Sequence, residues 1–184
     1  YGSGCPSFRR ITGVATLGVD GWQGFERWDS SMHGLAINAG AADVWSLALY
    51  QGDLVAGGIL GLAGNPPDWK SVLSPVRWDG HAWQSMENGC SQKLAVVGDE
   101  LISGGFNGVD RWDGARWHQM GNLTGLVFAI AGYQGRIYVG GEFKIGVPGE
   151  SATLATYDGT EWVRVPAAPN TAEYNTPRVA ALEV

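Results

Sequence analysis

Short runs of alternating apolar and polar residues, each ended by turn-forming residues, recur along the chain. Alternation with a period of two places successive side chains on opposite faces of a β-strand. Three pairs of such runs are joined by Gln51-Gly52, Gly98-Asp99 and Gln134-Gly135, which are residue types common in tight turns. In chain order the runs are 45–50 with 53–58, 93–97 with 100–105, and 128–131 with 136–141. Each pair predicts an antiparallel hairpin whose second strand contains Gly-Gly.

A second hairpin is predicted after each of these pairs. In three segments an aromatic residue precedes Asp-Gly and a tryptophan follows five residues after that aromatic: 76–83, 110–117 and 155–162. A degenerate copy spans 25–33, with Ser30 in place of Gly and His33 in place of Trp. Asp-Gly between apolar runs is a strong signal for a tight hairpin.

The Asp-Gly pairs also predict a register. If Asp79 and Gly80 are the two central residues of a type I′ turn, both need positive φ. Trp78 would then face His81, and Val76 would face Trp83. We expect the repeated aspartates to serve these turns, and the repeated aromatic residues to pack between neighbouring units.

Two hairpins together make one four-stranded antiparallel unit, and repeated units of this kind predict a small β-propeller of about four blades. The predicted blades are 44–86, 90–120, 125–165, and a last blade made of 178–184 plus 9–37. In that last blade the N- and C-terminal strands would pair, which closes the ring and covers exposed strand edges. Residues 1–184 are therefore expected to form a single all-β domain. An excerpt of a longer propeller and a homodimer that exchanges its termini are the alternatives.

The repeated element Gly-Gly, loop, Arg-Trp-Asp-Gly and a later Trp resembles the kelch-like and related secreted bacterial propeller repeats, over nearly the whole chain. The resemblance implies a propeller fold in a secreted protein. It implies no particular activity, because propellers of this kind carry unrelated functions. The copper site of kelch-like galactose oxidases has no matching motif in this sequence.

Charge and hydropathy limit the classes of partner that the chain is expected to bind. The net charge is −6, and the lysines are Lys70, Lys93 and Lys144, so the basic footprint of a nucleic-acid-binding protein is missing. No apolar run has the roughly 20 residues that cross a bilayer, and membrane insertion is not expected. Because Tyr1 stands first in place of Met, we expect a processed or excised chain.

Residues for catalysis are not evident. His33, His81 and His118 occupy different positions relative to the repeated aromatic residues, so equivalent blades would hold them at different heights and no shared metal site is expected. No segment matches a phosphate-binding loop, a nucleophile elbow or a zinc-protease helix. We therefore predict no catalytic residues, no metal site and no cofactor.

Two tryptophans lie outside the repeat and point to a ligand. Trp22 and Trp69 fall in segments expected to connect the second and third strands of adjacent blades, with Asp20, Asp68 and Lys70 beside them. Aromatic residues on exposed loops often mark recognition surfaces. These five residues are the predicted ligand-binding site, on one face of the disc.

Two covalent features stay open. Cys5 and Cys90 form an even pair, which suits a disulfide, but the predicted strand directions start them on opposite faces. Asn122-Leu-Thr124 is a glycosylation sequon between two blades.

Taken together, the sequence predicts a non-catalytic recognition or structural module, extracellular or on the cell surface, that binds a glycan or a protein. It would be a monomer or a strand-exchanged homodimer. One alternative is an enzyme whose loops build an active site at the propeller mouth. Another is an excised or engineered propeller fragment.

Overall fold

The computed structural model describes residues 15–18, 21–24, 34–37, 40–41, 43–64, 70–87, 92–146, 148–166 and 182. Every regular element among them is a β-strand, and all strand pairs are antiparallel. Among these residues, no helix has the length and apolar character that a membrane span requires. The prediction of an all-β chain is confirmed.

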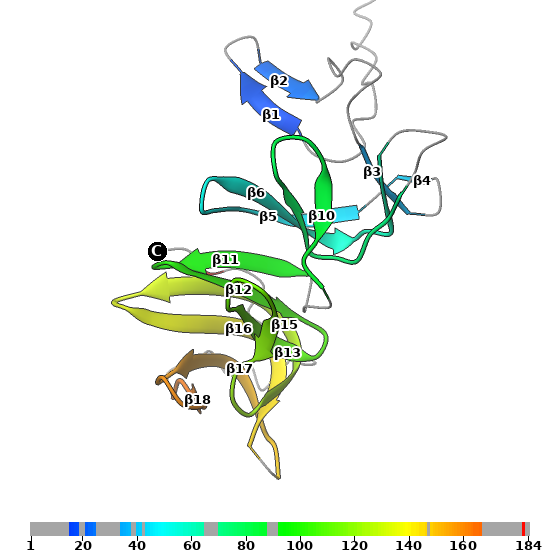
Figure 1. Cartoon of the computed structure of the whole chain (residues 1–184). Helices are drawn as coiled ribbons and strands as arrows, with labels where there is room; N and C mark the ends of the chain where they lie inside the picture. Colours follow the sequence, from blue (N-terminus) through cyan, green and yellow to red (C-terminus); the bar gives the residue numbers. More distant parts are fainter. Residues whose placement is uncertain are drawn as a thin grey trace, which may run out of the picture.

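Three four-stranded sheets follow the three complete repeats (Figure 1). Sheet I consists of β5 (Asp43–Tyr50), β6 (Asp53–Ile59), β9 (Val76–Trp78) and β10 (Trp83–Ser85). Sheet II consists of β11 (Lys93–Val97), β12 (Glu100–Gly105), β13 (Gly108–Trp112) and β14 (Trp117–Gln119). Sheet III consists of β15 (Leu123–Tyr133), β16 (Arg136–Ile145), β17 (Glu150–Tyr157) and β18 (Trp162–Arg164). In each sheet the strands are paired in chain order, as the repeat predicted.

A fourth four-stranded sheet, which we call the accessory sheet, has a different origin. Its strands pair in the order β4 (Gly40–Ala41), β3 (Gly34–Ile37), β7 (Leu62–Gly64) and β8 (Lys70–Ser71). Strands β7 and β8 lie in the connection between β6 and β9, which the sequence analysis treated as a surface loop. They contain only two or three residues each, too few to produce a recognisable alternation.

The N-terminal part of the predicted last blade is described only in part. Strand β1 (Ala15–Gly18) pairs with β2 (Gly21–Gly24) in a two-stranded sheet, and Trp22 lies opposite Leu17 there. Trp22 is thus on a strand, whereas the sequence placed it in a connecting loop. The predicted pairing of 9–17 with 178–184 falls mostly outside the described residues and stays a prediction.

The type I′ geometry occurs in the first hairpin of a repeat, where the sequence analysis did not place it. Gln51 and Gly52 have φ of 53° and 89°, and Gln134 and Gly135 have φ of 49° and 74°. These residues are the two central positions between Tyr50↔Asp53 and Tyr133↔Arg136. Positive φ at both central residues is the mark of a type I′ turn.

The predicted register of the Asp-Gly hairpins is wrong. Trp78 pairs with Trp83, and Val76 pairs with Ser85, so the turn is centred one residue later, on Gly80 and His81. The Asp79 carboxylate explains the difference, because Oδ1 accepts hydrogen bonds from the backbone N–H groups of His81 and Ala82, both at 2.8 Å. Asp therefore acts as a side-chain acceptor that closes the turn, and Gly80 takes the positive φ of 94°.

This register places the repeated aromatic residues directly opposite each other. Ring centroids lie 5.4 Å apart in Trp78–Trp83, 5.2 Å apart in Trp112–Trp117 and 5.2 Å apart in Tyr157–Trp162, at similar tilts. Each pair packs against a neighbouring part of the molecule: the first against Ala63 of the accessory sheet and the flanking Leu60 and Val72, the second against sheet I, and the third against sheet II. The prediction that these aromatics pack between repeat units is confirmed for the pairs of sheets II and III, whereas the pair of sheet I packs on the accessory sheet, which the sequence did not predict.

The first strands of the three repeat sheets also meet. Strand β11 contacts both β5 and β15, and the Leu94 backbone N–H donates to the Ser46 hydroxyl at 2.9 Å across the first of these contacts. Equivalent edges of successive sheets thus lie together, and this brings equivalent positions of the repeat into one place.

Candidate functional site

Three equivalent positions of the repeat converge on an open hollow. Trp45, Gln92 and Phe128 each directly precede the residue that pairs with the first glycine of Gly-Gly; those pairs are Ser46↔Gly57, Lys93↔Gly104 and Ala129↔Gly140. Together with Val44 and Lys93 they line a cavity of ≈ 480 Å³. We call these five residues the aromatic hollow. Its volume falls within the range of about 300–1,000 Å³ that is common for small-ligand sites.

The two aromatic residues of the hollow are both extra residues at β-bulges. In sheet I the pairing steps from Val44↔Gly58 to Ser46↔Gly57, and in sheet III from Val127↔Gly141 to Ala129↔Gly140. Trp45 and Phe128 are the residues passed over. A bulge inserts an unpaired residue and re-aims its side chain, and bulges are frequent beside functional sites.

The second glycine of Gly-Gly permits these bulges. A Cβ atom on Gly58 would lie 2.0 Å from the Asp43 carbonyl oxygen, and one on Gly141 would lie 2.1 Å from that of Leu126. No side chain fits at such distances, so the backbones can approach only where the residue is glycine. The Gly-Gly motif thus supports the aromatic hollow as well as the repeat.

The side chains of the hollow offer both apolar and polar contacts. Trp45 is 39% exposed, whereas Gln92 is 9% exposed. The Gln92 backbone N–H donates to the Gly104 carbonyl at 3.1 Å, which fixes this residue, but its carboxamide has no hydrogen-bond partner within the described part of the chain. A carboxamide has both donor and acceptor capacity, and a ligand in the hollow could use it.

Most of the predicted ligand-binding residues cannot be compared with this hollow. Asp20, Asp68 and Trp69 lie outside the described residues, and for Trp22 only the backbone is described. Lys70 is exposed on β8 of the accessory sheet. The loop-face site therefore stays a prediction, and so does the disulfide, because Cys5 and Cys90 also lie outside the described residues.

The sequon residue Asn122 ties sheet II to sheet III. Its Oδ1 accepts a hydrogen bond from the Trp162 backbone N–H at 3.0 Å, and its Nδ2 donates to Glu161 at 3.4 Å. The Trp162 indole N–H in turn donates to the Met120 carbonyl at 2.7 Å. The amide of Asn122 already serves these contacts, so a glycan attached there would leave Nδ2 one N–H with which to donate to Glu161.

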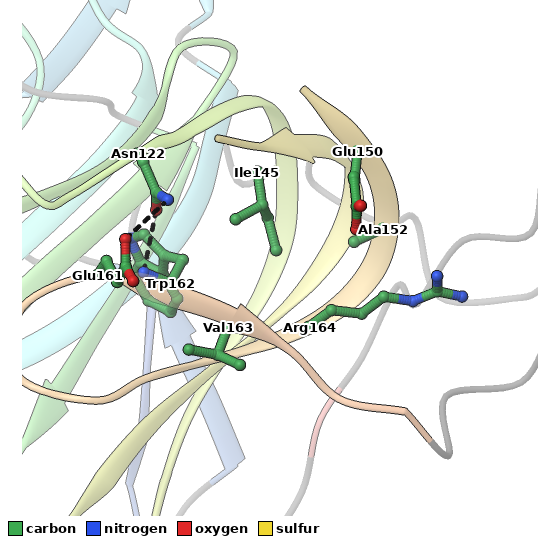
Figure 2. A pocket seen from close by; sticks show the side chains of 8 residues that line it. All are labelled: Asn122, Ile145, Glu150, Ala152, Glu161, Trp162, Val163 and Arg164. Atoms are coloured by element: carbon green, nitrogen blue, oxygen red, sulfur yellow. Dashed lines mark hydrogen bonds between the residues drawn. The ribbon is translucent and has the colours of Figure 1, made fainter. Parts of the chain in front are cut away.

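Asn122 also borders a second cavity, of ≈ 340 Å³, at the outer edge of sheet III. Figure 2 shows Asn122, Glu161 and Trp162 joined on one side, Glu150 and Ala152 on another, and the Arg164 side chain extending away from the Asn122 group. Its floor includes Ile145 and Val163. The polar groups nearest Trp162 are hydrogen-bonded to one another, so we interpret this cavity as part of the packing between sheets.

The repeated aspartates are structural acceptors. Backbone hydrogen bonds from Ala82 and His81 lower the pKa of Asp79 to about 2, and those from Arg116 and Ala115 lower the pKa of Asp113 to about 2. Two backbone N–H groups also lower the pKa of Asp158. A carboxylate held in its ionised form in this way is unsuited to donating a proton near neutral pH. Within the described ranges, no three His, Cys, Asp or Glu residues gather as metal ligands.

The sequence analysis missed Trp45, Gln92 and Phe128, although a signal existed. Aligning the repeats on Gly-Gly places these three residues in one column. Comparison with known proteins adds no further guide, since no family model and no curated protein matches this chain.

Proposed function

We propose that this protein is a non-catalytic carbohydrate-binding module of the extracellular space or cell surface, and that the aromatic hollow holds the saccharide. One observation carries the proposal: bulges in two different sheets direct Trp45 and Phe128 into the same open hollow. Aromatic side chains offer large rigid faces for contact, and the apolar C–H faces of sugar rings suit such faces. The Gln92 carboxamide offers both a donor and an acceptor to sugar hydroxyls.

The chemistry of the hollow favours binding over hydrolysis. Glycoside hydrolysis requires two carboxyl groups on opposite sides of the scissile bond. The described residues that line the hollow include one ionisable side chain, that of Lys93, and no carboxylate. The alternative of an enzyme with an active site at the propeller mouth would need acids from outside this set.

The same proposal includes a ring of four blades, closed by 178–184 together with 9–37. Its support is the exposed inner part of one face of sheet I, whose outer part packs against Ala63 of the accessory sheet. There Leu47 is 44% exposed, whereas Leu94, its equivalent in sheet II, is 8% exposed because sheet I packs against it. Leu49 is also exposed on this face of β5. A further blade packed beside β5 would bury both leucines.

Binding can be tested on an oligosaccharide array followed by isothermal titration with any saccharide retained. We expect Trp45→Ala and Phe128→Ala each to weaken binding at least about tenfold, because aromatic residues in the centre of a site dominate affinity. Phe106→Ala is the matched control, since Phe106 is an exposed aromatic outside the hollow. Absence of any retained saccharide, or equal binding by all three variants, contradicts the proposal. If only the double variant Trp22→Ala, Trp69→Ala loses binding, the ligand binds at the predicted loop site and not in the aromatic hollow.

Ring closure can be tested by cross-linking. In a chain with Cys5→Ser and Cys90→Ser, we expect Ile11→Cys and Leu182→Cys to be joined within one chain by a short thiol-specific reagent. The product should keep the monomer mass of 19.5 kDa. Cross-linking between two chains would indicate exchanged termini, and no cross-link would contradict closure by these strands.

A further inference from the structure

Lys93 is the cationic residue of the aromatic hollow, and the residues at the corresponding positions of the flanking sheets are uncharged. Lys93 pairs with Gly104, and the equivalent residues in sheets I and III are Ser46 and Ala129. Sheet II thus places an ammonium group where its neighbours have a hydroxyl and a methyl group. The chain as a whole is acidic, with a net charge of −6, so the charge in the hollow is opposite in sign to the net charge of the chain.

Lys93 differs also from the arginines of the same sheets. Arg77 is paired with Asp53, and Arg111 with Glu100 at 3.0 Å. Lys93 is half-buried, and no carboxylate within the described ranges forms an ion pair with it. A partly desolvated charge that lacks a counter-ion gains from an anion brought by a ligand.

The position of β11 fixes which part of a bound sugar would meet this charge. Strand β11 contacts β5 on one side and β15 on the other, so Gln92 and Lys93 come from the strand between the two that carry Trp45 and Phe128. A sugar ring stacked on either aromatic side chain therefore lies beside β11, and its ring substituents are the groups that can reach Lys93. An exocyclic carboxylate and a sulfate ester are both edge substituents of a sugar ring.

From this arrangement we infer that the saccharide in the aromatic hollow is acidic, with an anionic group on its ring edge that pairs with Lys93. The inference rests on the proposed function and deepens it. Gln92, next along the chain, then bonds the neighbouring hydroxyl, and the aromatic residues hold the ring. Neutral sugars satisfy the aromatic contacts but leave the ammonium group without a partner.

The test compares matched saccharides with and without the anionic charge. Titrations use oligogalacturonate, oligomannuronate and oligoglucuronate against their methyl esters, and a sulfated oligosaccharide against its desulfated form. We expect the wild-type chain to bind at least one acidic form about tenfold or more better than its neutral counterpart, as a charge-assisted contact provides. Preference among the carboxylates or for the sulfate then identifies the source of the anion.

Variants of the lysines give the decisive control. Lys93→Gln should abolish the preference, so that the acidic and neutral forms bind with similar affinity, and Lys93→Arg should retain the preference. Lys144→Gln is the matched control, because Lys144 is exposed on β16 and outside the hollow. Raising the salt concentration from about 50 mM to about 500 mM should weaken the acidic form alone.

Two results would overturn the inference, and they are distinguishable. If neutral and acidic forms bind equally and Trp45→Ala still abolishes binding, the pairing with Lys93 is wrong while the proposed function stands. If no member of the panel or the array binds the wild-type chain, the proposed function fails together with the inference.

Discussion

In the three repeat sheets, the outer hairpins (β9–β10, β13–β14 and β17–β18) share their key residue types, whereas the inner strands (β5, β11 and β15) differ at equivalent positions. At the outer hairpins the same residue types recur in every sheet, with an Asp that closes the turn and an aromatic pair about 5 Å across, packed on the next sheet. At the inner strands the equivalent positions hold Trp45, Gln92 and Phe128, which differ in size and polarity. The repeated residues thus hold the sheets together, and the residues that differ between repeats shape a candidate site.

The largest difference is expected between two tryptophans. Trp162 is 1% exposed and its indole N–H is hydrogen-bonded to Met120, so Trp162→Ala should cost about 3–5 kcal/mol of unfolding free energy. Trp45→Ala, at an exposed position, should cost less than about 1 kcal/mol. Urea denaturation followed by circular dichroism measures both. Equal losses would erase the distinction between outer packing and inner site.

The next largest effect is expected at two glycines, Gly141 and Gly135. Gly141→Ala places a Cβ against the Leu126 carbonyl at the inner bulge, and we expect a loss of about 2–3 kcal/mol. Gly135→Ala serves as the control, because nothing lies within 4 Å of its Cβ and the cost should be limited to the strain of positive φ, about 1 kcal/mol. Denaturation of both variants gives the values. A Gly141→Ala protein as stable as Gly135→Ala would contradict the role assigned to the second glycine.

The outer turns should give the protein an acid-sensitive stability. The pKa values of Asp79 and Asp113 are lowered to about 2 in the folded chain, against about 3.9 when unfolded. Their contribution is therefore present above about pH 4 and is lost as the pH falls through the folded values. The melting temperature should be steady from about pH 7 to 5 and fall between about pH 4 and 2.

Asp113→Asn tests this dependence, since the amide oxygen can still accept the turn hydrogen bonds but does not ionise. We expect a shallower fall of melting temperature with acid for Asp113→Asn. Asp99→Asn, in the turn between β11 and β12, should leave the slope as in the wild type. An unchanged slope in Asp113→Asn would show that the turn carboxylate does not govern acid stability.

The smallest effect is expected at the ion pair between adjacent strands of sheet II. Arg111 and Glu100 are both about half exposed, and surface pairs contribute roughly 0–1 kcal/mol. Arg111→Gln should therefore change the unfolding free energy by less than about 1 kcal/mol. Chemical denaturation at low and high salt checks it. A loss as large as that of Trp162→Ala would mean that charge, rather than aromatic packing, holds the outer strands.

Much of the sheet structure was predictable because its signals are local. Alternation over five or six residues and a turn pair suffice to place a hairpin such as 93–105, and the structure has it at β11 and β12. The register at Asp79 was not predictable from the Asp-Gly pair. Two turn geometries suit that pair, and the choice between them depends on where the carboxylate finds backbone donors.

The site was hidden for a different reason. Trp45 and Phe128 lie in strands whose alternation looks regular, and a bulge shows only when the partner strand is known. The accessory sheet was hidden because β3 and β7 are far apart in sequence and very short. The predicted loop residues Asp20, Asp68 and Trp69 stay untested because they fall outside the described residues.

The repeated antiparallel four-stranded sheets follow from the amino-acid sequence alone, since strand period and turn chemistry act between neighbouring residues. Only the tertiary structure decided that Trp45, Gln92, Lys93 and Phe128 share one hollow. That outcome depends on the bulges and on the packing of three sheets side by side, and such contacts join residues that no local pattern connects.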